Sequence, residues 1–189
     1  TLPSGSNYWG IIETVTGPKD YISQYLPYPE DLSIFNFSKG TFDGIEGYTC
    51  NVKIYENLPA YLIIPFEYNN LPVFAIGRST SGTTANQANV TSVYIPDCVR
   101  RFESYAFSNY KNLTAIDTTN ITYIGERCFT NCASLTSIRI PGTTKNILEY
   151  CLSGCSKLEN VILEEGIESI GMYSFKDNTS LRGLKGPKS

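Results

Sequence analysis

Apolar residues recur through the second half of the chain with a period of about 23 positions. Units with the same pattern begin at Val90, Leu113, Leu135, Leu158 and Leu181, which are 23, 22, 23 and 23 residues apart. In most units, further apolar residues follow three and five positions after the first. The period of two at the end of this pattern predicts a short strand. Pro96 or Pro141 would end it, because proline cannot donate to a strand ladder.

The remainder of each unit carries two more groups of mostly apolar residues. The first is a pair three residues apart, namely Val99/Phe102, Ile121/Ile124, Thr144/Ile147 and Ile167/Ile170. The second joins a small residue to a large one, namely Ala106-Phe107, Cys128-Phe129, Cys151-Leu152 and Ser174-Phe175. We expect a single helical turn at this second group. Ordering one unit costs roughly 35 kcal/mol at about 1.5 kcal/mol per residue, more than its few inward side chains return. The units must therefore stack and complete one another's core.

These repeats resemble the BspA-type, or treponemal, leucine-rich repeat. The segments LTSIRIP, ESIGMYSF, RCFTNCAS and SYAFSNYKN fit the pattern of that family. The resemblance implies an α/β repeat fold, a right-handed leucine-rich repeat solenoid of short strands and single helical turns. Proteins of this family are found on bacterial and protozoan cell surfaces and are associated with adhesion and host-protein binding. The resemblance therefore implies an extracellular or cell-surface protein.

We expect the chain to divide into two regions. Residues 1–57 do not follow the repeat and are expected to form a β-rich N-terminal capping region with a hairpin, because terminal repeats need caps. Residues 58–189 are expected to form the solenoid. Its parts are an irregular coil at 58–89, regular repeats at 90–112, 113–134, 135–157 and 158–180, and a partial repeat at 181–189.

Two local features refine this division. Apolar and polar residues alternate over positions 48–55, which predicts one strand of a hairpin that turns at 56–59 and returns over 60–64. In the irregular coil, Ile64 and Ile76 are 12 residues apart, whereas the matching Ile95 and Phe102 are 7 apart. This difference predicts an insertion of 5 residues within 66–72.

Composition narrows the classes of function. The chain contains no histidine, which removes Ser-His-Asp and Cys-His catalysis and imidazole metal ligands. We therefore expect no enzymatic activity and no cofactor. A net charge of −3 argues against nucleic acid and anionic membrane as general partners, and no apolar run is long enough to insert into a membrane. Because Thr1 is not a natural start, we expect a trimmed product whose export signal was removed.

Four cysteines have a spacing that superficially matches a zinc site: Cys128, Cys132, Cys151 and Cys155. The repeat favours buried structural thiols instead, because Cys128 and Cys151 share a column with Ala106 and Ser174. A disulfide stays open as well, since cysteines stacked at strand spacing lie within bonding range and an exported protein would permit the bond.

Ser108 and Lys111 match the Ser-x-x-Lys pattern of some hydrolases. The same two columns hold Thr130 and Ala133 in the next repeat, so neither residue type is specific to a site. We therefore expect both Ser108 and Lys111 to be exposed residues without a catalytic role.

The outward positions of the predicted strands are the expected binding surface, because solenoids bind partners on extended sheet faces. Tyr94, Arg139 and Ile162 would form one column there, with Asp117 between the first two and Thr136 and Glu159 beside it. Tyrosine and arginine are frequent anchors of protein interfaces. The expected partner is a protein ligand, such as a host matrix or cell-surface protein.

Two alternatives remain open from the sequence. The N-terminal aromatics, with Trp9 and its tyrosine neighbours, could form a carbohydrate-binding platform in an accessory domain. Capping of the solenoid core by Tyr8, Trp9, Phe35 and Phe37 is the other interpretation of the same residues. The chain could also be a structural spacer within a surface protein.

Overall fold

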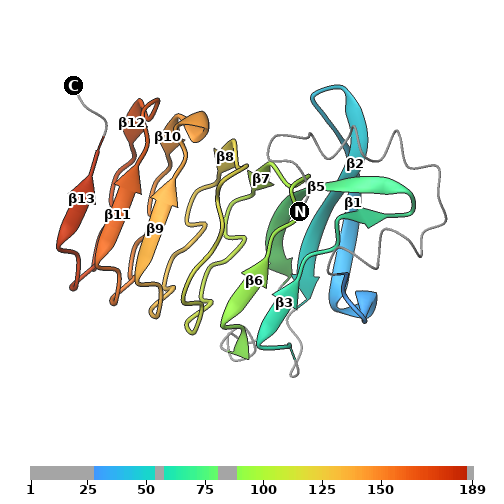
Figure 1. Cartoon of the computed structure of the whole chain (residues 1–189), viewed down its shortest axis with the longest axis horizontal. Coiled ribbons are helices and arrows are strands. Elements are labelled where there is room, and N and C mark those ends of the chain that lie inside the picture. The colour runs from blue at the N-terminus through green and yellow to red at the C-terminus, as the bar shows by residue number, and fades with distance from the viewer. Residues whose placement is uncertain (1–27, 54–57, 81–88, 187–189) are drawn as a thin grey trace, which may run out of the picture.

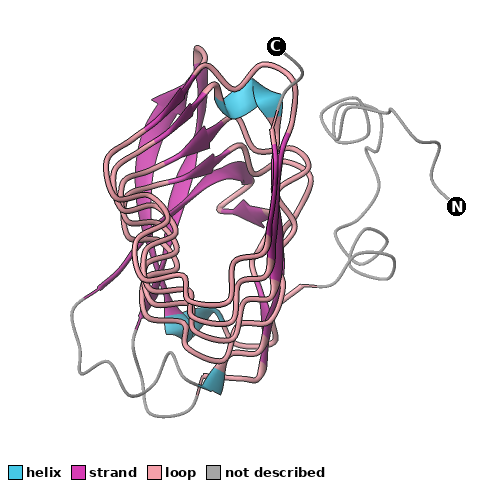
Figure 2. Cartoon of the chain, turned by 90° about the vertical axis from the view of Figure 1, so that its left-hand side faces the viewer, coloured by secondary structure: helices cyan, strands magenta, loops and turns pink. Residues whose placement is uncertain are grey.

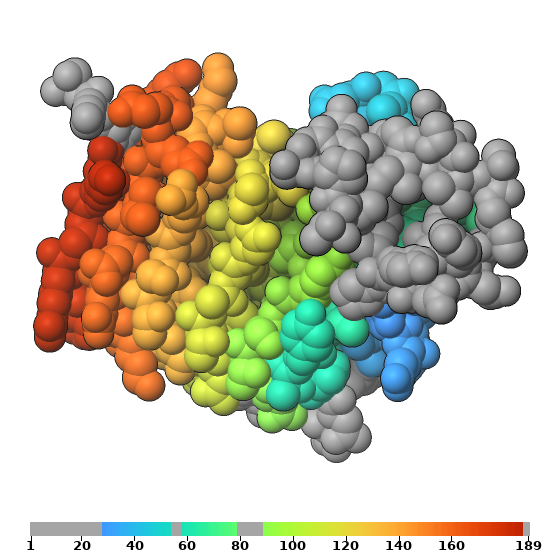
Figure 3. Space-filling view, viewed as in Figure 1, coloured from blue at the N-terminus to red at the C-terminus, as the bar shows by residue number. Residues whose placement is uncertain are grey.

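Each repeat closes one coil, and successive coils lie side by side along a single axis (Figure 1). The structure is a computed structural model that describes residues 28–53, 58–80 and 89–186. Viewed along the stack, the coils superpose, with strands on two sides and loops between them (Figure 2). The space-filling view shows the same coils as parallel bands of atoms from green to red (Figure 3). The stacking predicted from the 23-residue period is therefore confirmed.

The first sheet is built from the strands that begin each coil. It consists of β3 (Tyr61–Ile63), β6 (Ser92–Tyr94), β9 (Ser137–Ile140), β11 (Asn160–Leu163) and β13 (Gly183–Lys185). All pairings are parallel, and they form two separate groups, β3 with β6 and β9 with β11 and β13.

The coil at 113–134 has no strand between these two groups. The carboxylate of Asp117 accepts hydrogen bonds from the backbone N–H and the hydroxyl of Thr119, at 2.9 and 2.7 Å, which turns the chain away from strand geometry. Thr118 occupies the inward column and is buried, and its hydroxyl donates to the carbonyl of Arg139 in the next coil. The buried hydroxyl of Thr118 therefore has a hydrogen-bond partner. The turn at Asp117 interrupts the first sheet.

The second sheet lies on the opposite side of the coils (Figure 1). It contains β1 (Phe35–Phe42), β2 (Ile45–Lys53), β5 (Leu71–Thr80), β7 (Arg101–Phe102) and β8 (Tyr123–Ile124) in that order. A separate pair, β10 (Asn146–Ile147) and β12 (Ser169–Ile170), continues on the same side. Between β8 and β10 the chain forms a short 3-10 helix, η3 (Gly142–Thr144).

The hairpin expected over residues 48–64 is wrong. Strand β2 pairs antiparallel with the preceding strand β1, and Asp43 and Gly44, both with positive φ, form the turn. The expected return strand, β3, pairs instead with β6 in the first sheet. The alternation of residues 48–53 identified a half-buried strand correctly, but alternation does not specify which neighbour a strand pairs with.

The β1–β2 hairpin extends the second sheet beyond β5. Strand β2 lies parallel to β5, and Cys50 and Val52 of β2 are fully buried in the core. Phe35 of β1 is 3% exposed and belongs to the same apolar cluster. A 3-10 helix, η1 (Leu32–Ile34), precedes β1, with Asp31 accepting a hydrogen bond from the Ser33 N–H at its start. Strands β1 and β2 therefore contribute buried residues to the same core as the repeats.

The single helical turn expected in each repeat is also wrong, and with it the α/β class. The segments after β7, β8, β10 and β12 consist of consecutive turns, and no residue that the structure describes is α-helical. Each segment contains two residues with positive φ four positions apart, such as Tyr105 and Asn109 or Arg127 and Asn131. Left-handed residues stop an α-helix from propagating.

These turns leave alternate backbone N–H groups free to bond to the next coil. The N–H groups of Tyr105, Phe107 and Asn109 donate across to the following repeat at 3.0, 2.9 and 2.8 Å. The same ladder joins the later coils, for example from Phe129 to Cys151 at 2.8 Å. Backbone groups that a helix would have paired internally instead hold neighbouring coils together.

The extra residues of the irregular first coil form a small hairpin within residues 66–72, where the insertion was predicted. Strand β4 (Glu67–Tyr68) pairs antiparallel with the start of β5, and Asn69 and Asn70 between them both have positive φ. Two consecutive asparagines with positive φ form the tight turn typical of two-residue hairpins. Tyr68 stacks on Phe37 with ring centroids 3.8 Å apart, which holds this small hairpin against the cap.

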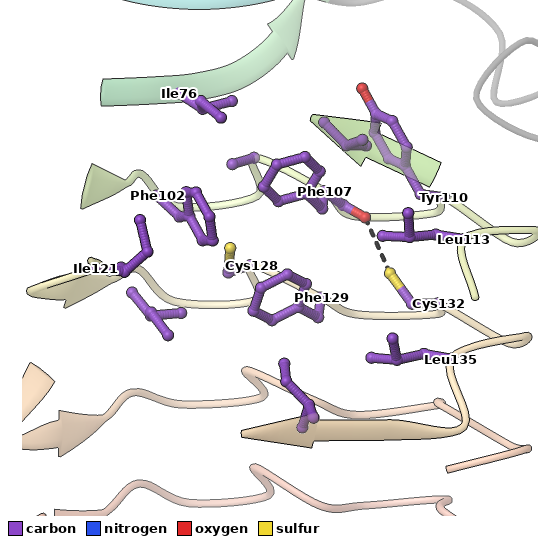
Figure 4. Packing of buried hydrophobic residues seen from close by; sticks show 14 of the residues in the cluster. Ile76, Phe102, Phe107, Tyr110, Leu113, Ile121, Cys128, Phe129, Cys132 and Leu135 are labelled. Atoms are coloured by element: carbon purple, nitrogen blue, oxygen red, sulfur yellow. Dashed lines mark hydrogen bonds between the residues drawn. The ribbon is translucent and has the colours of Figure 1, made fainter. Parts of the chain in front are cut away.

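In the core, side chains from equivalent positions of successive repeats lie over one another along the stack. Phe107 and Phe129 stack with centroids 5.7 Å apart and planes 5° apart, and Leu113 lies over Leu135 in the neighbouring file (Figure 4). Phe102 meets Phe107 edge to face at 5.0 Å. All five of these side chains are fully buried. Neighbouring coils therefore supply the apolar contacts that no single repeat could make alone.

Candidate functional site

Five of the six residues expected to bind a partner lie on strands of the first sheet or directly before them, and the sixth, Asp117, does not. Tyr94 lies on β6, Arg139 on β9 and Ile162 on β11, whereas Asp117 lies in the coil that has no strand. Thr136 and Glu159 precede β9 and β11 and are neighbours, since the Glu159 N–H donates to the Thr136 carbonyl at 2.9 Å. None of the six side chains is buried.

The structure brings only part of the expected column into register. Arg139 is the direct partner of Ile162 in the β9–β11 ladder, and Ile162 is the partner of Lys185 in the β11–β13 ladder. We name these three residues the C-terminal column. Tyr94 is in register with Ile63 in the other group of strands. Asp117 uses its carboxylate on Thr119, so it does not connect the two halves of the face.

A groove of about 490 Å³ borders the C-terminal column. Arg139, Ile162 and Lys185 line it together with Leu163, Glu164, Glu165 and Gly186. Two of these residues form an ion pair, in which an Nη of Arg139 donates to Oε1 of Glu164 at 2.5 Å. That hydrogen bond is the main cause of a lowered pKa of Glu164, and the Gly142 N–H also contributes. The groove therefore combines a fixed carboxylate, a cation and an aliphatic surface.

Sequence reasoning missed Lys185 and the pairing of Glu164. Lys185 occupies the same position of its repeat as Arg139 does, so the repeat alignment contained the signal. Glu164 lies just beyond its strand, where the periodic pattern does not predict which residue it faces. Tyr94 is half-buried, and burial followed by the charge of Asp97 raises its pKa.

The six cysteines are free thiols, and every one is buried. Sγ of Cys132 donates to the Phe107 carbonyl at 3.2 Å (Figure 4). Sγ of Cys155 donates to the Phe129 carbonyl at the same distance. Burial raises the pKa of Cys98, Cys151 and Cys155 to about 12. Neutral thiols that donate to the backbone are structural groups. Across residues 28–53, 58–80 and 89–186, no cluster of three or more cysteines or carboxylates is arranged to hold a metal ion.

The expectation for the Ser-x-x-Lys pair is wrong for one member. Ser108 is buried, 8% exposed, and its hydroxyl accepts a hydrogen bond from the Asn109 amide at 3.2 Å. Lys111 is exposed, as expected. Ser108 lies beside Phe107 in the turn segment, and its backbone N–H donates to the Tyr105 carbonyl at 3.1 Å.

The aromatic platform expected from the sequence centres on Trp9 and its tyrosine neighbours. Trp9 and Tyr8 lie outside the residues that the structure describes. Phe35 and Phe37 lie on β1, where Phe35 is buried and Phe37 is covered by Tyr68. These two rings pack into the cap and do not form an open surface. Within the described part of the chain, no helix has the length and apolar character needed to cross a membrane.

Comparison with known proteins places this geometry among leucine-rich repeats. A family model described as the BspA type leucine rich repeat region matches residues 81–189, in 6 copies. The chain is also similar to the solved structure of a leucine rich cell surface protein from Faecalibacterium prausnitzii A2-165, with 24% identity and a TM-score of 0.63. That alignment covers 87% of this chain and 44% of the other, so this chain spans less than half of that protein.

A second similar structure is the leucine rich repeat protein of T. pallidum, with 17% identity and a TM-score of 0.52. Here the alignment covers 83% of this chain and 97% of the other. At these identities the two likenesses establish the fold. No curated protein matches the sequence of this chain.

Proposed function

The chain belongs to the family of proteins with BspA-type leucine-rich repeats, and from this premise we propose that it is an exported, non-enzymatic protein that binds a protein partner through its first sheet. The C-terminal column is the observation that supports this proposal most directly. Arg139, Ile162 and Lys185 lie in register on three parallel strands and border one groove. A protein partner would meet them at the same time.

The chemistry of this face fits a protein interface. The Arg139 side chain is 59% exposed, yet its ion pair with Glu164 restricts its position. An arginine held in place beside an aliphatic side chain loses little entropy on binding, and such residues are frequent interface anchors. The partner that fits is a protein surface with a carboxylate next to an apolar side chain, such as a host matrix or cell-surface protein.

The absence of histidine from the sequence supports a non-enzymatic function, because it removes the usual proton shuttle at neutral pH. The buried, hydrogen-bonded Ser108 supports it as well, since a nucleophilic serine must reach a substrate. The description of the F. prausnitzii protein as a cell surface protein supports a location outside the cell for this chain.

The proposal is tested by measuring binding of the purified chain to arrayed matrix proteins and glycans. A protein that binds the wild type is then titrated against the double variant Arg139→Ala/Ile162→Ala. We expect a loss of affinity of at least tenfold, because truncating an anchor in an interface costs about 1–2 kcal/mol or more.

The matched control is Lys145→Ala/Glu168→Ala, which removes an exposed ion pair of 3.4 Å beside the β10–β12 pair of the same two coils. This control should bind as the wild type does. Equal loss in both double variants would contradict the assignment of binding to the first sheet. Binding to glycans alone would contradict a protein ligand and favour a carbohydrate-binding module.

A further inference from the structure

A second groove lies on the other side of the molecule, where the tip of the β1–β2 hairpin meets the outer face of the second sheet. Its volume is about 670 Å³, larger than that of the groove on the first sheet. The hairpin contributes Thr41, Phe42, Asp43 and Ile45, β5 contributes Phe74, and the coils around β7 and β8 contribute Arg100, Arg101, Glu103 and Thr122. This volume is typical of sites that hold a small ligand or a few residues of a peptide.

One wall of the groove is apolar and fixed in place. The rings of Phe42 and Phe74 have centroids 5.4 Å apart. Gly47 lets the hairpin backbone lie directly on Phe74, since a Cβ there would be 2.5 Å from the ring. Ile45 at the hairpin tip is 46% exposed, one of the few large apolar side chains with that exposure among the described residues. Ile45 lines the groove beside Phe42 and Phe74, and the close contact of Gly47 with Phe74 holds this wall in position.

The opposite wall carries a guanidinium held in a defined orientation. Nε of Arg101 donates to Oε1 of Glu103 at 2.8 Å, and the guanidinium lies 4.0 Å above the centre of the Tyr123 ring. No described residue accepts a hydrogen bond from the two terminal nitrogens of Arg101. Its side chain remains 35% exposed. The adjacent Arg100 differs, because it donates to the backbone carbonyls of Asp97 and Val99.

A planar guanidinium with two free terminal nitrogens is suited to a carboxylate, which it can bind through two parallel hydrogen bonds. Glu103 is already engaged by Arg101, and Asp43 at the hairpin tip would repel any further acidic group. The groove therefore accepts one carboxylate next to an apolar side chain. On a peptide C-terminus, both groups belong to the same residue, so a short ligand can satisfy both walls.

We infer that this groove binds the C-terminal residue of a peptide or protein, with the terminal carboxylate on Arg101 and an aliphatic side chain against Ile45 and Phe42. This site is independent of the surface on the first sheet. Both walls come from segments far apart in sequence, and the pairing of β2 with β5 and of β5 with β7 brings them together.

The test is an NMR titration of the isotope-labelled full chain with N-acetyl-leucyl-leucine, following the Ile45 methyl groups and the Arg101 Nε–H. The free acid should shift both signals and saturate in the millimolar range. The C-terminal amide of the same dipeptide should bind at least about tenfold more weakly, because it lacks the charge-assisted pair. N-acetyl-glutamyl-leucine amide places the carboxylate on an internal side chain and should also bind more weakly.

Two variants separate binding from folding. Arg101→Gln should weaken binding of the free acid about tenfold, and Ile45→Ala, at an exposed position, should weaken it several-fold without loss of stability. Arg182→Gln removes an exposed arginine of another coil and should leave the titration unchanged. Equal binding of acid and amide, equal binding of the internal carboxylate, or no effect of Ile45→Ala would overturn the inference.

Discussion

Burial keeps the thiols of this chain in their neutral form, and this is the clearest property of its individual residues. Cys128 and Cys151 share one position of the repeat with Ala106 and Ser174, and all four side chains are buried. Desolvation is the largest cause of the raised pKa at every cysteine. An ionised thiolate would be left in an apolar interior, which the fold cannot stabilise.

We therefore predict that the stability of the protein falls as the pH rises above 9. The pKa of Cys98, Cys151 and Cys155 is raised from 9.0 to about 12, so unfolded thiols ionise above pH 9 while the folded ones stay neutral. Each such thiol lowers the free energy of unfolding by up to about 1.4 kcal/mol per pH unit in this range. Urea denaturation at pH 8, 9 and 10 under reducing conditions measures the effect.

Cys128→Ala is the informative variant, because it reproduces the residue that the preceding coil uses at the same position. Its stability should fall less steeply between pH 9 and 10 than that of the wild type. Identical slopes for the two proteins would mean that Cys128 does not contribute to the pH dependence.

Close approach of the coils, more than turn conformation, explains the recurring glycines of the repeat elements. Gly125 follows β8 and Gly171 follows β12, and neither has a positive φ. A Cβ on Gly125 would lie 2.3 Å from the backbone nitrogen of Ser104, and one on Gly171 would lie 2.8 Å from that of Glu149. These glycines let one coil rest against the backbone of its neighbour.

Gly125→Ala should therefore destabilise the protein by about 1–3 kcal/mol, the usual cost of overpacking against atoms that cannot move. Gly40→Ala is the matched control, since a Cβ there would meet only the Phe42 ring at an ordinary 3.5 Å. We expect Gly40→Ala to be neutral or stabilising by up to about 1 kcal/mol, because alanine restricts the unfolded chain. Urea denaturation at pH 7 compares the two, and equal costs would refute the explanation by close approach.

The turn segments show why one element was predicted incorrectly. One left-handed column contains Asn109, Asn131, Gly154 and Asp177, which favour positive φ and could have signalled a non-helical turn. The other contains Tyr105, Arg127, Tyr150 and Tyr173, which do not favour it. The backbone N–H groups of Tyr105, Arg127 and Tyr150 donate to the next coil, a tertiary contact that the sequence of one repeat does not contain.

At the scale of the whole molecule, the repeat period was enough to predict the fold. The features that depart from the period could be identified only in the structure. Stacking, the inward columns and the outward positions of Arg139 and Ile162 all followed from the 23-residue frame. The groove near Ile45 did not, because it depends on the pairing of β1 with β2, and strand alternation does not specify a partner. The interruption of the first sheet likewise could not be predicted, because it depends on the hydrogen bond that the Asp117 carboxylate accepts from the Thr119 N–H.

A stack of coils should lose structure locally, because each coil contacts mainly its neighbours. Ile140 is 1% exposed, and an aspartate there would place an unpaired charge in the core at a cost of about 3–5 kcal/mol. We predict that Ile140→Asp abolishes hydrogen-exchange protection of β9 and β11 together, while β2 and β5 remain protected. Ser137→Asp, at an exposed position of the same strand, should leave the pattern unchanged. Simultaneous loss of protection in β2 and β5 would show that the coils unfold as one unit, because the cost of a single charge would then be transmitted along the entire stack.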